Sequence, residues 1–278
     1  MNGPPDDARA KEIAARDARQ EERRRSFDAA AAAYDTYRPG YPDELFTALA
    51  ARMPPPARVL EIAGGTGHAT LPLAQRGYPI RGIELGERLA AIAREKLSAY
   101  PAVQIDVGRF EESHVESQSA DLVVCASAFH WLLHAQALPK ISTALRSGGL
   151  LALLWTSAPE ADDHPFARAA RPIYQRLAPE LLVERARESA PSRMSRAVPG
   201  ILLGAPDFID FSHEEFRFTR TFSPQEYLGL LGTYSNYLTL PPATRDTLFA
   251  ELRELLEREF GNQVVHEFRS ALQFARRK

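Results

Sequence analysis

The chain has 278 residues, of which 45% are hydrophobic and 25% are charged, as in an ordinary soluble globular protein. Its formal net charge of −2 argues against a bulk electrostatic grip on nucleic acid. One cysteine, Cys125, excludes an internal disulfide and a cysteine-rich zinc site. Since the sequence shows neither a signal-type leader nor a membrane-length apolar run, we expect a cytoplasmic protein without nucleic-acid or membrane partners.

The first 42 residues divide into two stretches of different character. Residues 1–25 are polar, and acids alternate with arginines, which predicts a solvated arm. Residues 26–42 hold an alanine run that favours helix, followed by a Pro-Gly break. This stretch also carries Tyr34, Arg38 and Tyr41. It is either a helix packed on the core or a lid over a ligand pocket, and we favour the lid.

A glycine-rich turn follows a short apolar strand predicted at residues 59–62. The turn reads A-G-G-T-G at 63–67, and a helix is expected to begin at His68. Such a turn forms a nucleotide-type site, because glycine permits close approach and the helix N-terminus offers free N–H groups. The turn lacks the last small residue of a dinucleotide motif and the lysine of a phosphate loop. Glu61 would repel a pyrophosphate but attract a cation. This favours S-adenosylmethionine (AdoMet), which carries an ammonium and a sulfonium group.

Two further strands carry candidate cofactor contacts at their carboxyl ends. Residues 80–84 end in Glu84, which lies where an acid that binds ribose hydroxyls is expected after a glycine turn. Leu85 would then lie against the adenine. Residues 103–107 alternate as a third strand, and Gly108, Arg109 and Phe110 follow it.

A fourth strand, predicted at 121–126, ends at Ala126 and runs directly into S-A-F-H-W at 127–131. Ligands of open α/β sheets lie beyond the carboxyl ends of the strands, so this turn should face the transferred group. His130 could orient a substrate or take a proton there. Alternatively, its ring is held by backbone groups, with Trp131 in the core. A fifth strand is predicted at 150–155, after a turn at 146–149.

The remaining residues change in composition. Prolines recur between residues 157 and 205, which we interpret as an inserted helical cap over the substrate pocket. Strands are predicted at 215–222 and 264–274, with helices at 224–234 and 242–260 between them.

The motif V-L-E-I-x-G-G-T-G at 59–67 resembles motif I of class I AdoMet-dependent methyltransferases. Ala63 stands where the family normally has its first glycine, and it would be strained if that position needs a positive φ. The stretch at 27–42 and the F-H-W at 129–131 resemble the methyltransferase type 11 or trans-aconitate methyltransferase-like branch. The resemblance implies an α/β fold, with a Rossmann-like, mostly parallel seven-stranded sheet, helices on both faces and a helical cap. Residues 26–278 would form one domain.

The resemblance also assigns roles along the chain. The predicted AdoMet-binding residues are Tyr34, Glu61, Ala63, Gly64, Gly65, Gly67, Glu84, Leu85, Gly108, Arg109, Phe110 and Ala126. Arg109 stands where the family often has an acid that binds the adenine amino group. A backbone contact there, or packing by the Phe110 ring, is therefore expected instead. Arg38, Tyr41 and Trp131 are predicted to contact the substrate, and His130 to act in catalysis.

The implied activity is transfer of a methyl group from AdoMet to an oxygen, nitrogen or carbon nucleophile of a small molecule, by in-line displacement. A carboxylate acceptor is one candidate, since Arg38 permits an anion. The histidines are scattered, and we predict chemistry without a metal. The alternatives are an RNA or protein methyltransferase and a non-catalytic AdoMet-binding protein. The protein is expected to be a monomer or a homodimer.

Overall fold

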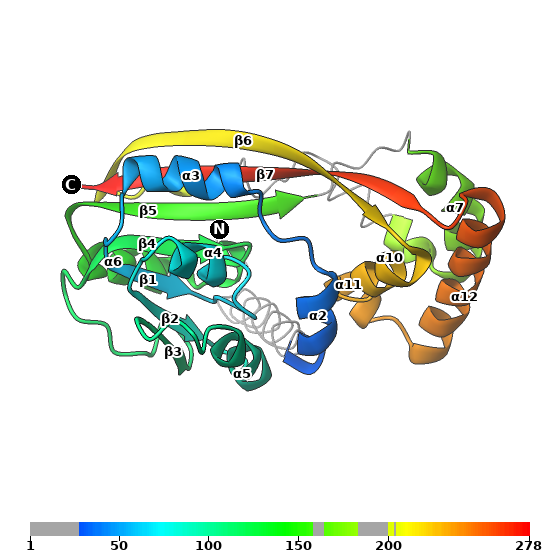
Figure 1. Ribbon diagram of the computed structural model, residues 1–278, viewed down its shortest axis with the longest axis horizontal. Helices are drawn as coiled ribbons and strands as arrows, with labels where there is room; N and C mark the ends of the chain where they lie inside the picture. The colour runs from blue at the N-terminus through cyan, green and yellow to red at the C-terminus, as the bar shows by residue number, and fades with distance from the viewer. Residues whose placement is uncertain (1–27, 158–163, 183–199, 203) are drawn as a thin grey trace, which may run out of the picture.

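The computed structural model describes residues 28–157, 164–182, 200–202 and 204–278. The predicted arm at 1–25 and much of the predicted insertion at 157–205 lie outside these ranges. Within them the chain forms a seven-stranded sheet in the order β3-β2-β1-β4-β5-β7-β6 (Figure 1). The strands are β1 (Val59–Ile62), β2 (Ile80–Glu84), β3 (Val103–Val107), β4 (Ala120–Ala126), β5 (Leu145–Ser157), β6 (Phe208–Phe222) and β7 (Val264–Arg277).

Strands β1 to β5 pair in parallel, and β7 runs antiparallel to both β5 and β6. The predicted α/β class with a mostly parallel seven-stranded sheet is therefore confirmed. The strand bounds were less accurate. β6 begins at Phe208, before the alternating pattern at 215–222, because it pairs with β7 nearly to the end of the chain. β5 already begins at Leu145, and the expected turn forms an irregularity in which Gly148 has φ of 72°.

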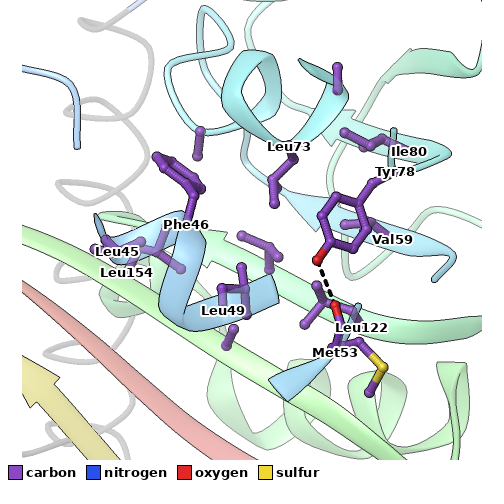
Figure 2. Packing of buried hydrophobic residues seen from close by; sticks show 14 of the residues in the cluster. Leu45, Phe46, Leu49, Met53, Val59, Leu73, Tyr78, Ile80, Leu122 and Leu154 are labelled. Atoms are coloured by element: carbon purple, nitrogen blue, oxygen red, sulfur yellow. Dashed lines mark hydrogen bonds between the residues drawn. The ribbon is translucent and has the colours of Figure 1, made fainter. Parts of the chain in front are cut away.

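Helices cover both faces of the sheet. They are α2 (Ala31–Tyr37), α3 (Asp43–Arg52), α4 (Thr70–Gln75), α5 (Glu87–Lys96), α6 (His134–Ala144), α7 (Pro165–Leu177), α10 (Pro224–Leu231), α11 (Ser235–Leu238) and α12 (Pro242–Glu259), with a short 3₁₀ helix η1 at Phe129–Trp131. Helices α3, α4 and α5 pack on one face, where Tyr78 also donates a hydrogen bond of 2.5 Å to Met53 O (Figure 2). Helix α6 packs on the other. No helix within the described ranges is long and apolar enough to cross a membrane.

A third apolar cluster lies away from the two faces of the parallel sheet. It joins α7 to α10, α11, α12 and the neighbouring ends of β6 and β7. Residues 264–268 of β7 pair with β6 but not with β5. This end of the two strands therefore extends beyond the parallel part of the sheet, and its apolar side chains pack against the helices. Figure 1 shows the four helices gathered at one end of the molecule. We call them the helical layer. The sequence had assigned only α7 to a cap, because nothing in the local pattern of α10–α12 reveals their partners.

Helix α2 lies between α5 and the helical layer (Figure 1). On the α5 side, Asp28 Oδ1 accepts hydrogen bonds from the backbone N–H groups of Arg88 (2.8 Å) and Leu89 (3.1 Å), in the first turn of α5. On the other side, the Tyr37 ring packs against Gly229 of α10. A Cβ added to Gly229 would lie only 2.5 Å from the ring. α2 therefore contacts both parts of the molecule.

We predict that Gly229→Ala lowers the free energy of unfolding by about 1–3 kcal/mol, because the new methyl group overlaps the Tyr37 ring. Helix propensity alone would favour alanine by about 1 kcal/mol. Urea denaturation measures the difference. Gly232→Ala is the matched control, since a Cβ there would have its nearest neighbours at 3.4 Å. Equal effects of the two substitutions would contradict the prediction.

Candidate active site

The glycine turn leaves the sheet at the carboxyl end of β1 through left-handed backbone. Ala63 N–H still donates to Ile83 O at 2.8 Å, so pairing with β2 continues to this residue. Its φ is then +54°, and Gly65 and Gly67 have φ of +58° and +85°. Ala63 was expected to be strained if its φ is positive, and its φ is positive. A side chain in this region costs about 1–2 kcal/mol.

Glu61 is fully buried beneath this turn. Its two carboxylate oxygens make no hydrogen bond to any residue in the described ranges. A Cβ added to Gly64 would lie 3.1 Å from Glu61 Cδ, so the glycine lets the turn pack directly on the carboxylate. Burial raises the pKa of Glu61 to about 7. The Thr70 hydroxyl, which also has no hydrogen-bond partner among the described residues, lies near enough to oppose this shift, and the Glu84 carboxylate adds to it. A buried group that lacks partners is costly, which suggests that a ligand supplies the missing donors.

Glu84 holds two turns together. One oxygen accepts a hydrogen bond from Gly65 N–H and the other from Gly86 N–H, both at 2.8 Å. Burial raises the pKa of this carboxyl. The expected contact of Glu84 with ribose hydroxyls stays a prediction. The structure adds a role that the sequence did not reveal, which is to fix the glycine turn against the start of α5.

Helix α2 covers the glycine turn with Tyr34. A Cβ added to Gly65 would lie 3.9 Å from Tyr34 Cε1, and the Tyr34 ring centroid lies 6.0 Å from that of His68. Asp35, the next residue of α2, forms an ion pair with Lys96 of α5. Its Oδ1 lies 3.8 Å from His68 Nε2. Nothing in the sequence singled out Asp35 as a contact between α2 and α5, because its partner lies on another helix.

Arg38 connects α2 to the helical layer. Its Nε donates to Thr233 Oγ1 at 2.8 Å and one terminal nitrogen donates to Thr233 O at 3.0 Å. The guanidinium also lies 4.3 Å from the ring centroid of Tyr234 and 5.2 Å from that of Tyr34. The predicted contact of Arg38 with an acceptor stays a prediction. No local pattern could have shown Thr233 as its partner, since the two residues are 195 positions apart.

The residues after Ala126 contact Tyr41 and include Trp131, the other two predicted substrate contacts. Tyr41 OH lies 2.9 Å from Ser127 Oγ. The ring centroid of His130 lies 4.5 Å from that of Trp131 and 5.6 Å from that of Trp155 on β5. His130 thus stands in a group of aromatic rings at the carboxyl ends of β4 and β5. Its catalytic role stays a prediction.

His130 and His134 are four residues apart, a spacing that can supply two metal ligands on a helix and an exception to the otherwise scattered histidines. In the structure His134 stacks on Phe129 at 4.7 Å between centroids, and its Nε2 lies 2.9 Å from Phe129 O. Among the described residues no cluster of three or more histidine, cysteine or acidic side chains could hold a metal ion.

The third strand contributes less to this site than its neighbours. Gly108 N–H donates to Glu84 O at 2.8 Å, and the Arg109 side chain forms an ion pair of 3.2 Å with Glu112. The Phe110 ring is 4% exposed and lies in the core on the α6 face. The two adenine contacts expected here, a backbone contact and packing by the ring, stay predictions. Leu85 is half-buried at the end of β2.

The strand order and the glycine turn at the carboxyl end of β1 define a class I methyltransferase fold. Residues 60–153 match the family model described as "Methyltransferase domain". These residues therefore form a methyltransferase domain of this class.

Known proteins agree with this classification. An uncharacterised methyltransferase of Mycobacterium tuberculosis is 28% identical over 232 residues, which cover 83% of this chain and 85% of that protein. A trans-aconitate 2-methyltransferase of Variovorax paradoxus is 32% identical over 127 residues, 44% of this chain and 48% of that protein. A structure described as a type II methyltransferase of Anaeromyxobacter dehalogenans superposes with a TM-score of 0.61 at 21% identity, covering 87% of this chain and 98% of that one.

We predict that Ala63→Gly raises the free energy of unfolding by about 0.5–1 kcal/mol. Glycine removes the left-handed strain of about 1–2 kcal/mol but adds flexibility to the unfolded chain. Urea denaturation measures the change. Ala48→Gly, within helix α3, is the control and should lower the free energy of unfolding by about 0.5–1 kcal/mol. A loss of stability in both variants would show that position 63 is not strained.

We predict that Glu61→Gln stabilises the free protein in a pH-dependent manner. The folded state holds the Glu61 proton to about pH 7, whereas an unfolded glutamate releases it near 4.5. The stability of the native protein should therefore fall as the pH rises through this window, by up to roughly 3 kcal/mol, and stay low above it. Glutamine carries no such penalty. Urea denaturation at pH 5 and pH 8 should give the variant its advantage mainly at pH 8, and an equal difference at both values would refute the assignment.

Proposed function

We propose that this methyltransferase uses S-adenosylmethionine and transfers its methyl group to a small-molecule acceptor by in-line displacement. The observation that carries the proposal is the buried Glu61 carboxylate, which has no hydrogen-bond partner among the described residues and lies beneath the glycine turn. Such a group requires a donor, preferably a cationic one. The ammonium group of AdoMet has both properties.

The electrostatics of the turn favour this cofactor over a dinucleotide. Glu61 and Glu84 are both buried, and burial raises the pKa of each because it disfavours the charged form. A pyrophosphate placed here would add negative charge beside two carboxyl groups. A cationic ligand would instead lower their pKa values and stabilise the ionised forms. The site thus gains most from a ligand without phosphate.

Several features support a small acceptor. Helix α2 lies over the glycine turn through Tyr34, and Arg38 joins it to Thr233 and Tyr234, between α10 and α11. This arrangement would restrict the approach of a large substrate. The similarity of 127 residues of the chain to trans-aconitate 2-methyltransferase supports a carboxylate as the acceptor to test first. An ionised carboxylate needs no base, because its oxygen is already nucleophilic.

The chemistry asks mainly for alignment. The sulfonium makes the methyl group labile, so the protein must hold the acceptor atom in line with it and exclude water. The aromatic group of His130, Trp131 and Trp155 provides a surface for this purpose. For acceptors that must lose a proton, His130 is the candidate base.

Calorimetric titration with AdoMet, and separately with NAD, tests the cofactor. We predict AdoMet binding that releases roughly half a proton or more at pH 6.5, because the cation ionises a Glu61 whose pKa in the free protein is about 7. Titrations in two buffers of different ionisation enthalpy measure the proton. Glu61→Gln should weaken binding and abolish that share of the release.

The proposal fails if AdoMet does not bind to the wild-type protein, or if NAD binds in its place. If AdoMet binds without proton release and Glu61→Gln binds equally well, Glu61 does not face the cofactor. Screening of acceptors would begin with small di- and tricarboxylic acids, with product formation followed by mass spectrometry.

A further inference from the structure

Two hydroxyl groups meet at the carboxyl end of β4, and neither belongs to the predicted cofactor contacts. Tyr41, in the segment between α2 and α3, places its hydroxyl 2.9 Å from Ser127 Oγ. Ser127 is the first residue after β4. The two residues are 86 positions apart, so the contact exists only in the folded protein.

The backbone of Ser127 is strained at this point. Its N–H donates to Leu154 O on β5 at 2.7 Å, so the chain is still paired with the sheet, and its φ is then +54°. Non-glycine residues in this conformation cluster at functional sites, where the surrounding structure holds them. Glycine would avoid the strain. The serine hydroxyl is the group that glycine would lack, and it is the group that Tyr41 contacts.

The hydroxyl pair adjoins the cofactor turn. Strands β1 and β4 are neighbours with Ile62 opposite Cys125, so Ala63 and Ser127 leave adjacent strand ends, both with a positive φ. Burial raises the pKa of Tyr41, and the nearby Tyr34 and Glu61 add to the shift. The Tyr41 hydroxyl therefore stays neutral.

We propose that the Tyr41–Ser127 hydroxyl pair lines the position of the transferred methyl group and selects the sulfonium form of the cofactor, an inference that rests on the proposed function. Whichever hydroxyl donates within the pair, both oxygens keep lone pairs. Oxygen lone pairs attract the positive charge of a sulfonium and the polarised C–H groups of its methyl. S-adenosylhomocysteine has neither this charge nor this methyl group. The pair thus holds the methyl group in place and lowers the relative affinity for the demethylated product.

The test measures the dissociation constants of AdoMet and S-adenosylhomocysteine by calorimetry for the wild type, Tyr41→Phe, Ser127→Ala and the double variant. We expect each single substitution to weaken AdoMet roughly 3- to 10-fold, the effect of one hydrogen bond, while S-adenosylhomocysteine changes less than about 2-fold. The double variant should bind AdoMet about as weakly as either single variant, because the hydroxyls act as a pair.

Tyr78→Phe is the matched control. It removes a buried tyrosine hydroxyl that donates to Met53 O, in the core shown in Figure 2, and should leave the ratio of the two affinities unchanged. Ser127→Gly also removes the hydroxyl but relaxes the backbone. It should shift the ratio of the two affinities in the direction expected for Ser127→Ala. It therefore provides the test if the alanine variant does not fold.

Equal weakening of both ligands in the variants would overturn the inference, since it would mean that the pair only supports the fold. An unchanged ratio in every variant would do the same. These results require that the wild type binds both ligands. If the wild type binds neither, the proposed function fails, and the inference fails with it.

Discussion

Neighbouring parallel strands end at the same edge of the sheet, and the chain must turn away from that edge within a few residues of each strand end. This constraint shapes the protein. At the ends of the adjacent strands β1 and β4 the chain turns through left-handed backbone at Ala63 and Ser127, neither of which is glycine. Turns this tight bring backbone N–H groups together at one point. The same geometry buries Glu61 beneath the glycine turn and lets Glu84 bridge Gly65 and Gly86.

The cost of this arrangement lies in charge as well as in backbone strain. A carboxyl group with no partner among the described residues and a pKa near 7 destabilises the free protein at neutral pH. Functional sites commonly carry such costs, because groups arranged for a ligand are not arranged for the empty fold. In this protein the unsatisfied carboxylate and the strained turns occur at the same edge of the sheet. We regard that coincidence as the main physical argument for a binding site there.

Helix α2 joins this edge to the rest of the molecule. Asp28, just before the helix, and Asp35 attach this segment to α5, Tyr34 lies over the glycine turn, and Arg38 binds Thr233. The segment after α2 carries Tyr41 to Ser127. A single stretch of about fifteen residues thus contacts the nucleotide-type turn, the end of β4 and the helical layer.

Much of the fold followed from the sequence because its signals are local. Short apolar strands separated by helical patterns predict a parallel sheet, and the run from Val59 to Gly67 predicts both a tight turn and its preference for a cation. The long β6 was harder to predict. Its first half does not alternate and is held as a strand by pairing with β7. The helices α10 to α12 also gave no sign of the cluster that they form with α7.

The sequence by itself determined the α/β class, the order of strands and helices, and the glycine turn with an acid just before it, since each depends on neighbouring residues. Only the tertiary structure decided which side chains meet. Arg38 bonds to Thr233, and Tyr41 to Ser127, across 195 and 86 positions. It also decided that Ala63 and Ser127 adopt a positive φ, because that angle is imposed by the strands on either side of them. Contacts between distant residues depend on how whole elements pack, and no local pattern encodes that packing.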